Sequence, residues 1–244
     1  MYQRNKIFVP ECKKRFAFLM ARHGESIWNQ DSLFTGWTDI PLTERGREES
    51  RRIAHSLIYH RVFPTIMYTS TLQRAIDTSN IIKKEMNREI PVYTSWRLNE
   101  RHYGKLEGVP RQHVRVNYGE KYTKMLRCNF HIKPPTDIDY TSLNENEYPI
   151  FRNCYYKRIK NGESKEDVLS RMLPYYENDI LYSMTKDNNI PLIVTHKHTA
   201  RVLMKHLLKI SDHDFEKYEI PSKKIFYIVL DEFMEYKEHD EFSY

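Results

Sequence analysis

The stretch FAFLMARHGE, residues 16–25, decides the fold of this chain because an apolar run leads directly into polar residues. The apolar part, residues 16–21, predicts a buried strand. Arg22 and His23 follow at its carboxyl end, which is where ligands bind in open α/β sheets. Gly24 is expected to let the backbone approach a bound group closely. The stretch therefore predicts a histidine and an arginine presented together to an anion, most naturally a phosphate.

A second junction of the same kind occurs far downstream, where residues 191–195 (PLIVT) lead into His196 and a helical pattern. Further strands are expected at residues 65–68, 90–93 and 225–230. Apolar residues at helical spacing predict helices over residues 72–86 and 202–210, another after Thr43 as N-cap, and a fourth over 165–184 with a kink near Pro174. This alternation predicts an α/β fold with three layers, a mostly parallel sheet flanked by helices.

Composition favours one domain and a small anionic ligand. The chain has 244 residues, 40% of them hydrophobic, and a formal charge of +6. That length and apolar content suit a single domain over residues 1–244. The positive charge favours an anionic partner. Basic residues are scattered and no aromatic-basic motif for RNA or DNA occurs, so we expect small anions rather than nucleic acid.

Cysteine use and hydropathy predict a soluble cytoplasmic protein. Cys12, Cys128 and Cys154 are odd in number and lack a paired Cys-x-x-Cys signature, so neither a disulfide framework nor a zinc site is indicated. The amino-terminal residues carry charges throughout, and no stretch of about 18 apolar residues occurs. We therefore expect a reducing compartment and no membrane association.

Two segments depart from the alternating pattern. Residues 132–162 carry two adjacent prolines and many Asn, Asp and Tyr residues without a sustained period, which indicates an inserted loop region. Residues 231–244 form an acidic tail. Two interpretations of the tail stay open: a removable cover over a basic site, and a solvated disordered end.

Candidate catalytic residues follow from what phosphoryl transfer needs. A neutral imidazole such as that of His23 attacks phosphorus, and fixed cations hold the oxygen charge. Arg22 and Arg74 suit this clamp because a guanidinium binds phosphate oxygens in pairs, and Arg74 follows another strand-to-helix junction. Glu100 is the candidate proton carrier. His196 would stabilise the transferring oxygens by hydrogen bonding.

Short strings of polar, glycine and aromatic residues recur along the chain. They are RHGES (22–26), FTGW (34–37), LTERG (42–46), YTS (68–70), LQRA (72–75), WRLNERHYG (96–104), PP (134–135), GES (162–164) and KHL (205–207). In kind and in order these strings resemble those of the cofactor-dependent phosphoglycerate mutases of the histidine phosphatase superfamily. The resemblance is strongest in residues 96–104 and extends over nearly the whole chain after about residue 14.

The resemblance implies roles for individual residues. His23 is the phosphorylated nucleophile, Glu100 the proton donor and acceptor, and Arg22, Arg74 and His196 the phosphate pocket. In such mutases 2,3-bisphosphoglycerate primes the histidine, the phosphoryl group moves between the 2- and 3-hydroxyls of glycerate, and no metal is needed. A homodimer or homotetramer is also implied. The substrate-contacting positions are Ser26, Asn29, Thr35, Gly36, Arg101, Tyr103, Arg111 and Arg127.

Departures from the family pattern gather near the same site. Lys197 and His198 replace a Gly-Asn step after His196, which is expected to strain the backbone if that glycine has positive φ. We count both residues among the substrate-binding candidates. Cys128 replaces a second arginine, which removes a cation from the carboxylate end of the pocket. Arg111 replaces a lysine, and Lys223 and Lys224 replace a Thr-Gly step, so charge is redistributed.

Alternatives to a mutase follow from these departures. A phosphatase for small phosphate esters would pass the phosphoryl group of His23 to water. A catalytically weak relative would only bind anionic metabolites or partners, although intact His23, Glu100 and His196 argue against it. A metal site formed by His196 and His198 with His23 is a further interpretation, but no carboxylate cluster of ligand spacing accompanies it, and we expect no metal.

Overall fold

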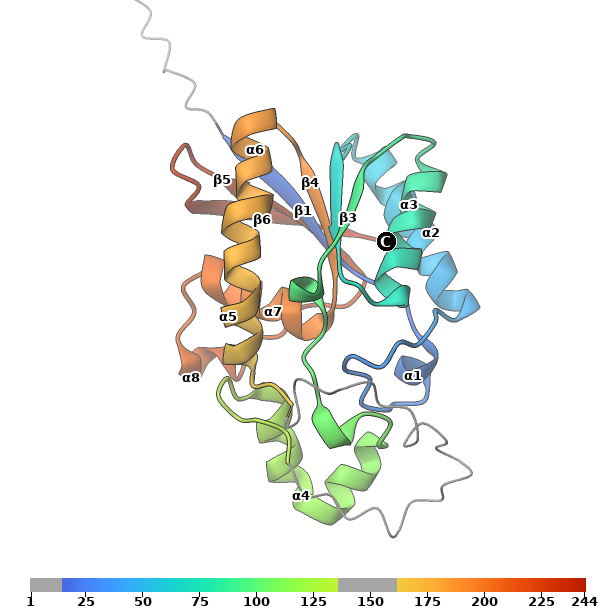
Figure 1. The fold of residues 1–244 in the computed structure, drawn as a ribbon, viewed down its shortest axis with the longest axis vertical. Coiled ribbons are helices and arrows are strands. Elements are labelled where there is room, and N and C mark those ends of the chain that lie inside the picture. The colour runs from blue at the N-terminus through green and yellow to red at the C-terminus, as the bar shows by residue number, and fades with distance from the viewer. Residues whose placement is uncertain (1–14, 136–161) are drawn as a thin grey trace, which may run out of the picture.

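A computed structural model describes residues 15–135 and 162–244. Cys12, Cys154 and most of the predicted loop region 132–162 lie outside these residues, as does the amino-terminal segment. The described chain forms an α/β fold in which helices flank a six-stranded sheet (Figure 1). The predicted fold class is therefore confirmed.

The sheet has the strand order β3-β2-β4-β1-β5-β6. Strands β3, β2, β4 and β1 run parallel, as predicted. β5 pairs antiparallel with β1, and β6 pairs antiparallel with β5 at the edge of the sheet. The sheet is thus mixed, and its parallel part lies on one side. The strands are β1 (Phe16–Arg22), β2 (Ile66–Thr69), β3 (Val92–Thr94), β4 (Pro191–Thr195), β5 (Lys224–Leu230) and β6 (Tyr236–Ser243).

Helices cover both faces of the sheet because β1 is apolar on both sides. Phe18 and Met20 pack in one apolar cluster with residues of α5 (Lys165–Tyr175), α6 (Tyr182–Asp187) and α7 (Lys197–Leu207). Leu19 and Ala21 face the opposite cluster, under α2 (Glu44–Tyr59) and α3 (Gln73–Glu85). Figure 1 shows these two helical layers on either side of the strands. Successive strand residues point to opposite faces, so a continuous apolar run is what a doubly covered strand requires.

Two predicted local features are present. The Thr43 hydroxyl accepts a hydrogen bond from the Gly46 amide and caps α2. The helical run that begins at Lys165 continues past Pro174 through a π-helical turn (Tyr176–Leu181) into α6. Proline has no amide hydrogen and its ring crowds the carbonyl four residues earlier, so an irregular turn beside it is expected.

The acidic carboxyl-terminal segment is neither a cover over a basic site nor a disordered end, so both interpretations of it are wrong. Residues 236–243 form β6, which pairs with β5 along the edge of the sheet. Phe242 stacks on His60 with ring centroids 4.2 Å apart, which fixes the strand against the end of α2. Lys237, Glu238, Asp240 and Glu241 of β6 are charged and exposed, and charge on an edge strand discourages pairing with another chain.

The sequence patterns did not reveal α4 (Arg111–Cys128), which lies at the bottom of Figure 1, away from the sheet. Only Val114, Thr123 and Leu126 are buried along its length, and Gly119 interrupts it with φ +84°. Too few apolar positions recur to give a helical stripe. The remaining short elements are α1 (Ile27–Gln30), the 3-10 turns Trp96–Leu98 and Gly104–Leu106, and α8 (Asp212–Phe215).

Candidate active site

The carboxyl ends of β1 and β4 lie side by side and bring two histidines together. Arg22 is the register partner of Thr195, and the His23 amide donates to the Thr195 carbonyl at 2.9 Å. The rings of His23 and His196 have centroids 4.8 Å apart. Parallel strands end at one edge of the sheet, so the two histidines predicted from separate junctions face one site.

Gly24 is required for a reason other than the predicted approach to a ligand. A Cβ at this position would lie 2.0 Å from the Gly46 carbonyl oxygen, and a Cβ on Gly46 would lie 2.0 Å from the Glu25 carbonyl oxygen. The turn after β1 therefore packs backbone against backbone on the start of α2. This close packing fixes the turn that carries His23.

His23 is held as a neutral imidazole with a defined tautomer. Its Nδ1 lies 2.6 Å from the Gly24 carbonyl oxygen, so Nδ1 donates and the lone pair is on Nε2. Burial, followed by the charges of Arg74 and Arg22, lowers the pKa of His23 well below its usual value. A neutral ring with a free Nε2 is the form that attacks phosphorus.

Three further groups surround His23 with hydrogen-bond donors. The buried Arg74 donates to the Gly36 carbonyl at 2.7 Å and the Thr38 carbonyl at 2.9 Å. Burial lowers the Arg74 pKa to about 10, which leaves it charged at neutral pH. Arg22 Nη2 donates to Asn29 Oδ1 at 3.2 Å. His196 Nε2 lies 2.8 Å from the Ser70 hydroxyl, and burial lowers its pKa well below the usual value.

Several buried polar atoms at this site have no hydrogen-bond partner among residues 15–135 and 162–244. They are Arg22 Nε, Thr35 Oγ1, Arg74 Nε, His196 Nδ1 and His198 Nδ1. Buried polar atoms in proteins are nearly always hydrogen-bonded, so such a group needs an explanation. Two guanidinium donors and a hydroxyl suit the oxygens of a phosphoryl group, which accept several hydrogen bonds at once.

Most of these residues border a cavity of about 160 Å³. Its lining is strongly cationic, because in the described part of the chain the side chains of four arginines and a lysine face the single carboxylate of Glu100. Of the residues predicted for the site, all but Ser26, Arg101 and His196 line it. The lining residues are Arg22, His23, Asn29, Phe34, Thr35, Gly36, Arg74, Glu100, Tyr103, Arg111, Arg127, Lys197 and His198.

Glu100 is held at the cavity wall by backbone donors. Its Oε1 accepts from the Arg101 amide at 2.8 Å and from the His198 amide at 3.2 Å. The neighbouring Arg101 guanidinium donates to backbone carbonyls of other segments. With its carboxylate beside the cavity, Glu100 is placed to exchange a proton with a bound hydroxyl.

Arg101 braces the fold instead of lining the cavity. Its guanidinium is buried and donates to the carbonyls of Glu163, Leu126 and Ile132, each at 2.6 Å. Ser26 is likewise buried at the start of α1, where its amide lies 3.4 Å from Asn29 Oδ1. His196 contacts the site through the ring of His23. The predicted site therefore divides into residues that line the cavity and residues that hold them.

Tyr103 and His198 form one wall of the cavity. The Tyr103 hydroxyl lies 2.8 Å from His198 Nε2. Burial raises the pKa of Tyr103 and lowers that of His198, so both are neutral. Phe34, which sequence reasoning did not single out, packs on Tyr103 with ring centroids 4.9 Å apart. Its place in the FTGW string was the signal that pointed to it.

The replacement residues after His196 behave differently from what the family comparison suggested. Lys197 is the first residue of α7 and does not have positive φ, so the expected backbone strain is absent. Its Nζ lies 2.7 Å from Glu219 Oε2, which neutralises much of its charge at the cavity. Among the replacement residues named above, it is Lys223 that has positive φ, at +60°. Cys128 is half-buried beside Arg127 and does not line the cavity.

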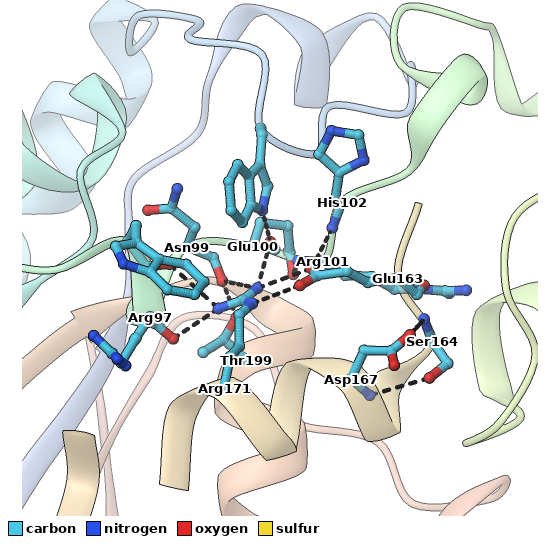
Figure 2. A network of polar contacts seen from close by, with 12 residues as sticks. Arg97, Asn99, Glu100, Arg101, His102, Glu163, Ser164, Asp167, Arg171 and Thr199 are labelled. Carbon is cyan, nitrogen blue, oxygen red and sulfur yellow. Dashed lines mark hydrogen bonds and ion pairs between the residues drawn. The ribbon is translucent and has the colours of Figure 1, made fainter. Parts of the chain in front are cut away.

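A dense polar network holds the loop that carries Glu100 (Figure 2). Arg171 of α5 pairs with Glu163 and donates to backbone carbonyls of the loop, including that of Glu100. The sequence string GES contained Glu163, but no pattern indicated Arg171. Both residues lie behind the loop and are absent from the cavity lining.

Comparison with known proteins identifies the class to which this fold and site belong. A family model described as the histidine phosphatase superfamily (branch 1) matches residues 18–147 and 137–233. The chain belongs to this superfamily. None of the helices in the described part of the chain is long and apolar enough to cross a membrane.

Within the superfamily, the chain is similar to bacterial proteins named 2,3-bisphosphoglycerate-dependent phosphoglycerate mutase. That of Clavibacter sepedonicus is 38% identical over 205 residues, covering 84% of this chain and 81% of the relative. That of Cutibacterium acnes is 37% identical over 220 residues, covering 88% and 86%.

Solved structures share the fold. A mycobacterial glucosyl-3-phosphoglycerate phosphatase superposes with a TM-score of 0.70 at 18% identity, covering 93% of this chain and 97% of that one. The protein YhfR of Bacillus stearothermophilus superposes with a TM-score of 0.69 at 25% identity, covering 91% and 94%.

Proposed function

We propose that this protein is a 2,3-bisphosphoglycerate-dependent phosphoglycerate mutase that interconverts 3-phosphoglycerate and 2-phosphoglycerate through phosphorylated His23. The observation that carries the proposal is that His23 and Glu100 line the same cationic cavity. His23 is neutral there, with its Nδ1 bound to the Gly24 carbonyl and the lone pair on Nε2. Relatives that carry this name match more than four fifths of the chain.

The residues of the cavity fit the bisphosphorylated glycerate that the family requires. Such a molecule has two phosphates and a carboxylate, and the cavity offers four arginines and a lysine as well as the unpartnered donors of Arg22 and Arg74. 2,3-Bisphosphoglycerate supplies the phosphoryl group that primes His23. Arg22, Arg74 and Thr35 would hold that group, and Arg111 and Arg127 would hold the distal anionic end.

Each step of the reaction has a residue in place. Nε2 of His23 attacks phosphorus while the Nδ1 hydrogen bond to Gly24 steadies the ring and stabilises the positive charge that develops on it. Arg22, Arg74 and His196 stabilise the equatorial oxygens in the transition state. Glu100 takes the proton from the attacking hydroxyl when the phosphoryl group returns to glycerate, and gives it back in the reverse step.

The proposal includes assembly and location. We place the enzyme in the cytoplasm as a single-domain homodimer or homotetramer, as the family resemblance implies, without a membrane, nucleic-acid or metal partner. Size-exclusion chromatography with light scattering measures the oligomeric state, and a monomer at micromolar concentration would contradict that part of the proposal.

One assay separates this function from its alternatives. Purified protein receives 3-phosphoglycerate with catalytic 2,3-bisphosphoglycerate, and both 2-phosphoglycerate and free phosphate are followed. We expect isomer formation in large excess over phosphate release, and loss of both with His23→Ala. Phosphate without isomer would identify a phosphatase. Lys197, His198 and Cys128, which depart from the mutase pattern, are the reason for considering that alternative. Anion binding without either product would identify a binding protein.

A further inference from the structure

A buried ion pair lies directly behind the loop that carries Glu100. Arg171 and Glu163 have side chains only 7% and 5% exposed. Their contact is bidentate, with Arg171 Nε to Glu163 Oε1 at 2.7 Å and Nη2 to Oε2 at 3.0 Å. Figure 2 shows the guanidinium at the centre of the network. Neither residue borders the cavity, so the pair has no part in the chemistry described so far.

Arg171 also holds the loop by its backbone, with Nη2 shared between Glu163 and the loop. Nη1 donates to the Arg97 carbonyl at 2.7 Å, and Nη2 donates to the carbonyls of Asn99 and Glu100, each at 2.9 Å. The planar guanidinium fixes the directions of these bonds, which a flexible ammonium does not. One side chain therefore sets the path of residues 97–100.

Glu163 holds the loop on the other side of Glu100. Its Oε2 accepts from the His102 amide at 2.8 Å, and its own amide donates to the His102 carbonyl at 2.8 Å. A capping box formed by Ser164 and Asp167 begins α5 at the next residue and anchors Glu163. The ion pair is thus hydrogen-bonded to the backbone both before Glu100, at residues 97 and 99, and after it, at residue 102.

The Glu100 carbonyl has a second side-chain donor beside Arg171. Trp37 Nε1 donates to the Glu100 carbonyl at 2.6 Å, and the Arg171 guanidinium lies 5.5 Å from the centroid of the Trp37 ring. Because the Glu100 carboxylate accepts from the Arg101 amide, its position follows the backbone at residues 100 and 101. A shift of the loop would move the carboxylate.

We infer that Arg171 and Glu163 are positioning residues that set the reach of the Glu100 carboxylate toward the hydroxyl in the cavity. The inference rests on the proposed function, in which Glu100 carries the proton. A general base must lie within hydrogen-bond reach of its proton, and displacements of about 1 Å cost rates on the order of 100-fold. Substrate affinity depends on the cavity arginines, which the pair does not contact.

A double-mutant cycle tests the inference. Arg171→Lys keeps the positive charge beside Glu163 but loses the fork that holds the carbonyls, and Glu100→Gln removes the proton carrier. We expect Arg171→Lys to lower kcat about 10- to 100-fold with KM within about twofold. In the Glu100→Gln background the same change should alter kcat by less than about threefold, because the carboxylate that it misplaces is gone.

A control separates positioning from general loss of stability. Leu57→Ala truncates a buried residue of α2 in the opposite helical layer, and we expect it to lower the Tm while retaining wild-type kcat. Trp37→Phe serves as a second probe of the loop if Arg171→Lys does not fold. It should lower kcat about 3- to 10-fold in the wild-type background and leave the Glu100→Gln rate unchanged.

The outcomes distinguish this inference from the proposed function. Equal fold-losses in the wild-type and Glu100→Gln backgrounds, or a loss confined to KM, would overturn the positioning role. A wild-type protein that releases phosphate without forming isomer would overturn the proposed function instead, and the same cycle would then be measured on the rate of phosphate release.

Discussion

Replacing Glu107 by glutamine tests the account of how the cavity arginine Arg74 is held. Glu107 is buried, and its carboxylate serves four donors. Oε1 accepts from the amides of Trp37 and Tyr103 at 3.0 Å each, and Oε2 accepts from the amide and hydroxyl of Thr38 at 3.0 and 2.8 Å. The turn so fixed presents the carbonyls of Gly36 and Thr38 to Arg74.

The expected loss follows from counting acceptors. Glutamine has one oxygen, so its amide nitrogen must face one of the two pairs of donors. In the better orientation the glutamine oxygen keeps the hydrogen bonds from the Trp37 and Tyr103 amides, and its NH2 group faces Thr38. The Thr38 hydroxyl can rotate to accept from this NH2 group, whereas the Thr38 amide is left facing a donor and loses its hydrogen bond. Losing one bond to a charged group costs about 1.5–3 kcal/mol, and weakening the others raises the total to about 2–4 kcal/mol.

Urea denaturation at pH 7 measures this loss in the free energy of unfolding. Glu89→Gln is the matched control, because the Glu89 side chain is 95% exposed and, among the residues that the structure describes, pairs only with Lys83. We expect the control to lie within about 0.5 kcal/mol of the wild type. We also expect Glu107→Gln to raise KM, because Arg74 loses its fixed carbonyls. A Glu107→Gln variant as stable as the control would show that the four bonds of the carboxylate do not hold this turn.

Three further predictions concern charge. Burial lowers the pKa of His23, His196 and His198, so below about pH 6.5 the unfolded state binds more protons than the folded state. The free energy of unfolding should therefore fall with decreasing pH, with a slope approaching about 4 kcal/mol per pH unit. His198→Asn should reduce this slope by the contribution of one proton, about 1.4 kcal/mol per pH unit, as measured by urea denaturation at a series of pH values. Burial, with the charges of nearby arginines, lowers the pKa of Lys165 to about 6. Between pH 7 and 9 the wild type should therefore gain about 2–3 kcal/mol relative to Lys165→Met, and parallel pH curves would contradict this. Glu219→Gln frees the charge of Lys197 and should lower the KM for phosphoglycerate about 2- to 5-fold at low salt, with the effect lost at high salt.

The parts of the fold that could be predicted from sequence are those whose patterns are local. The apolar runs before His23 and His196 predicted β1 and β4, and the rule that ligands bind at the carboxyl ends of strands predicted that both histidines face one site. Thr43 marked the start of α2 because capping depends on a few neighbouring residues.

The missed features depend on contacts between distant segments. The acidic residues 236–243 form a strand because β5 offers an open edge and His60 a stacking partner, and neither is visible in the tail itself. Arg101 was assigned to the substrate by resemblance, but three carbonyls from separate segments surround its guanidinium. Lys197 was counted among the substrate-binding candidates, and its pairing with Glu219 requires the loop before β5 to lie beside α7.

Direct detection of the phosphorylated protein tests whether His23 carries the phosphoryl group. The protein is incubated with 2,3-bisphosphoglycerate, quenched in base, which preserves phosphohistidine, and mapped by mass spectrometry and phosphorus NMR. We expect one phosphoryl group per chain on Nε2 of His23, because Nδ1 is bound to the Gly24 carbonyl, and we expect its transfer to added 3-phosphoglycerate. An active protein that carries phosphate on another residue, or on none, would contradict this expectation.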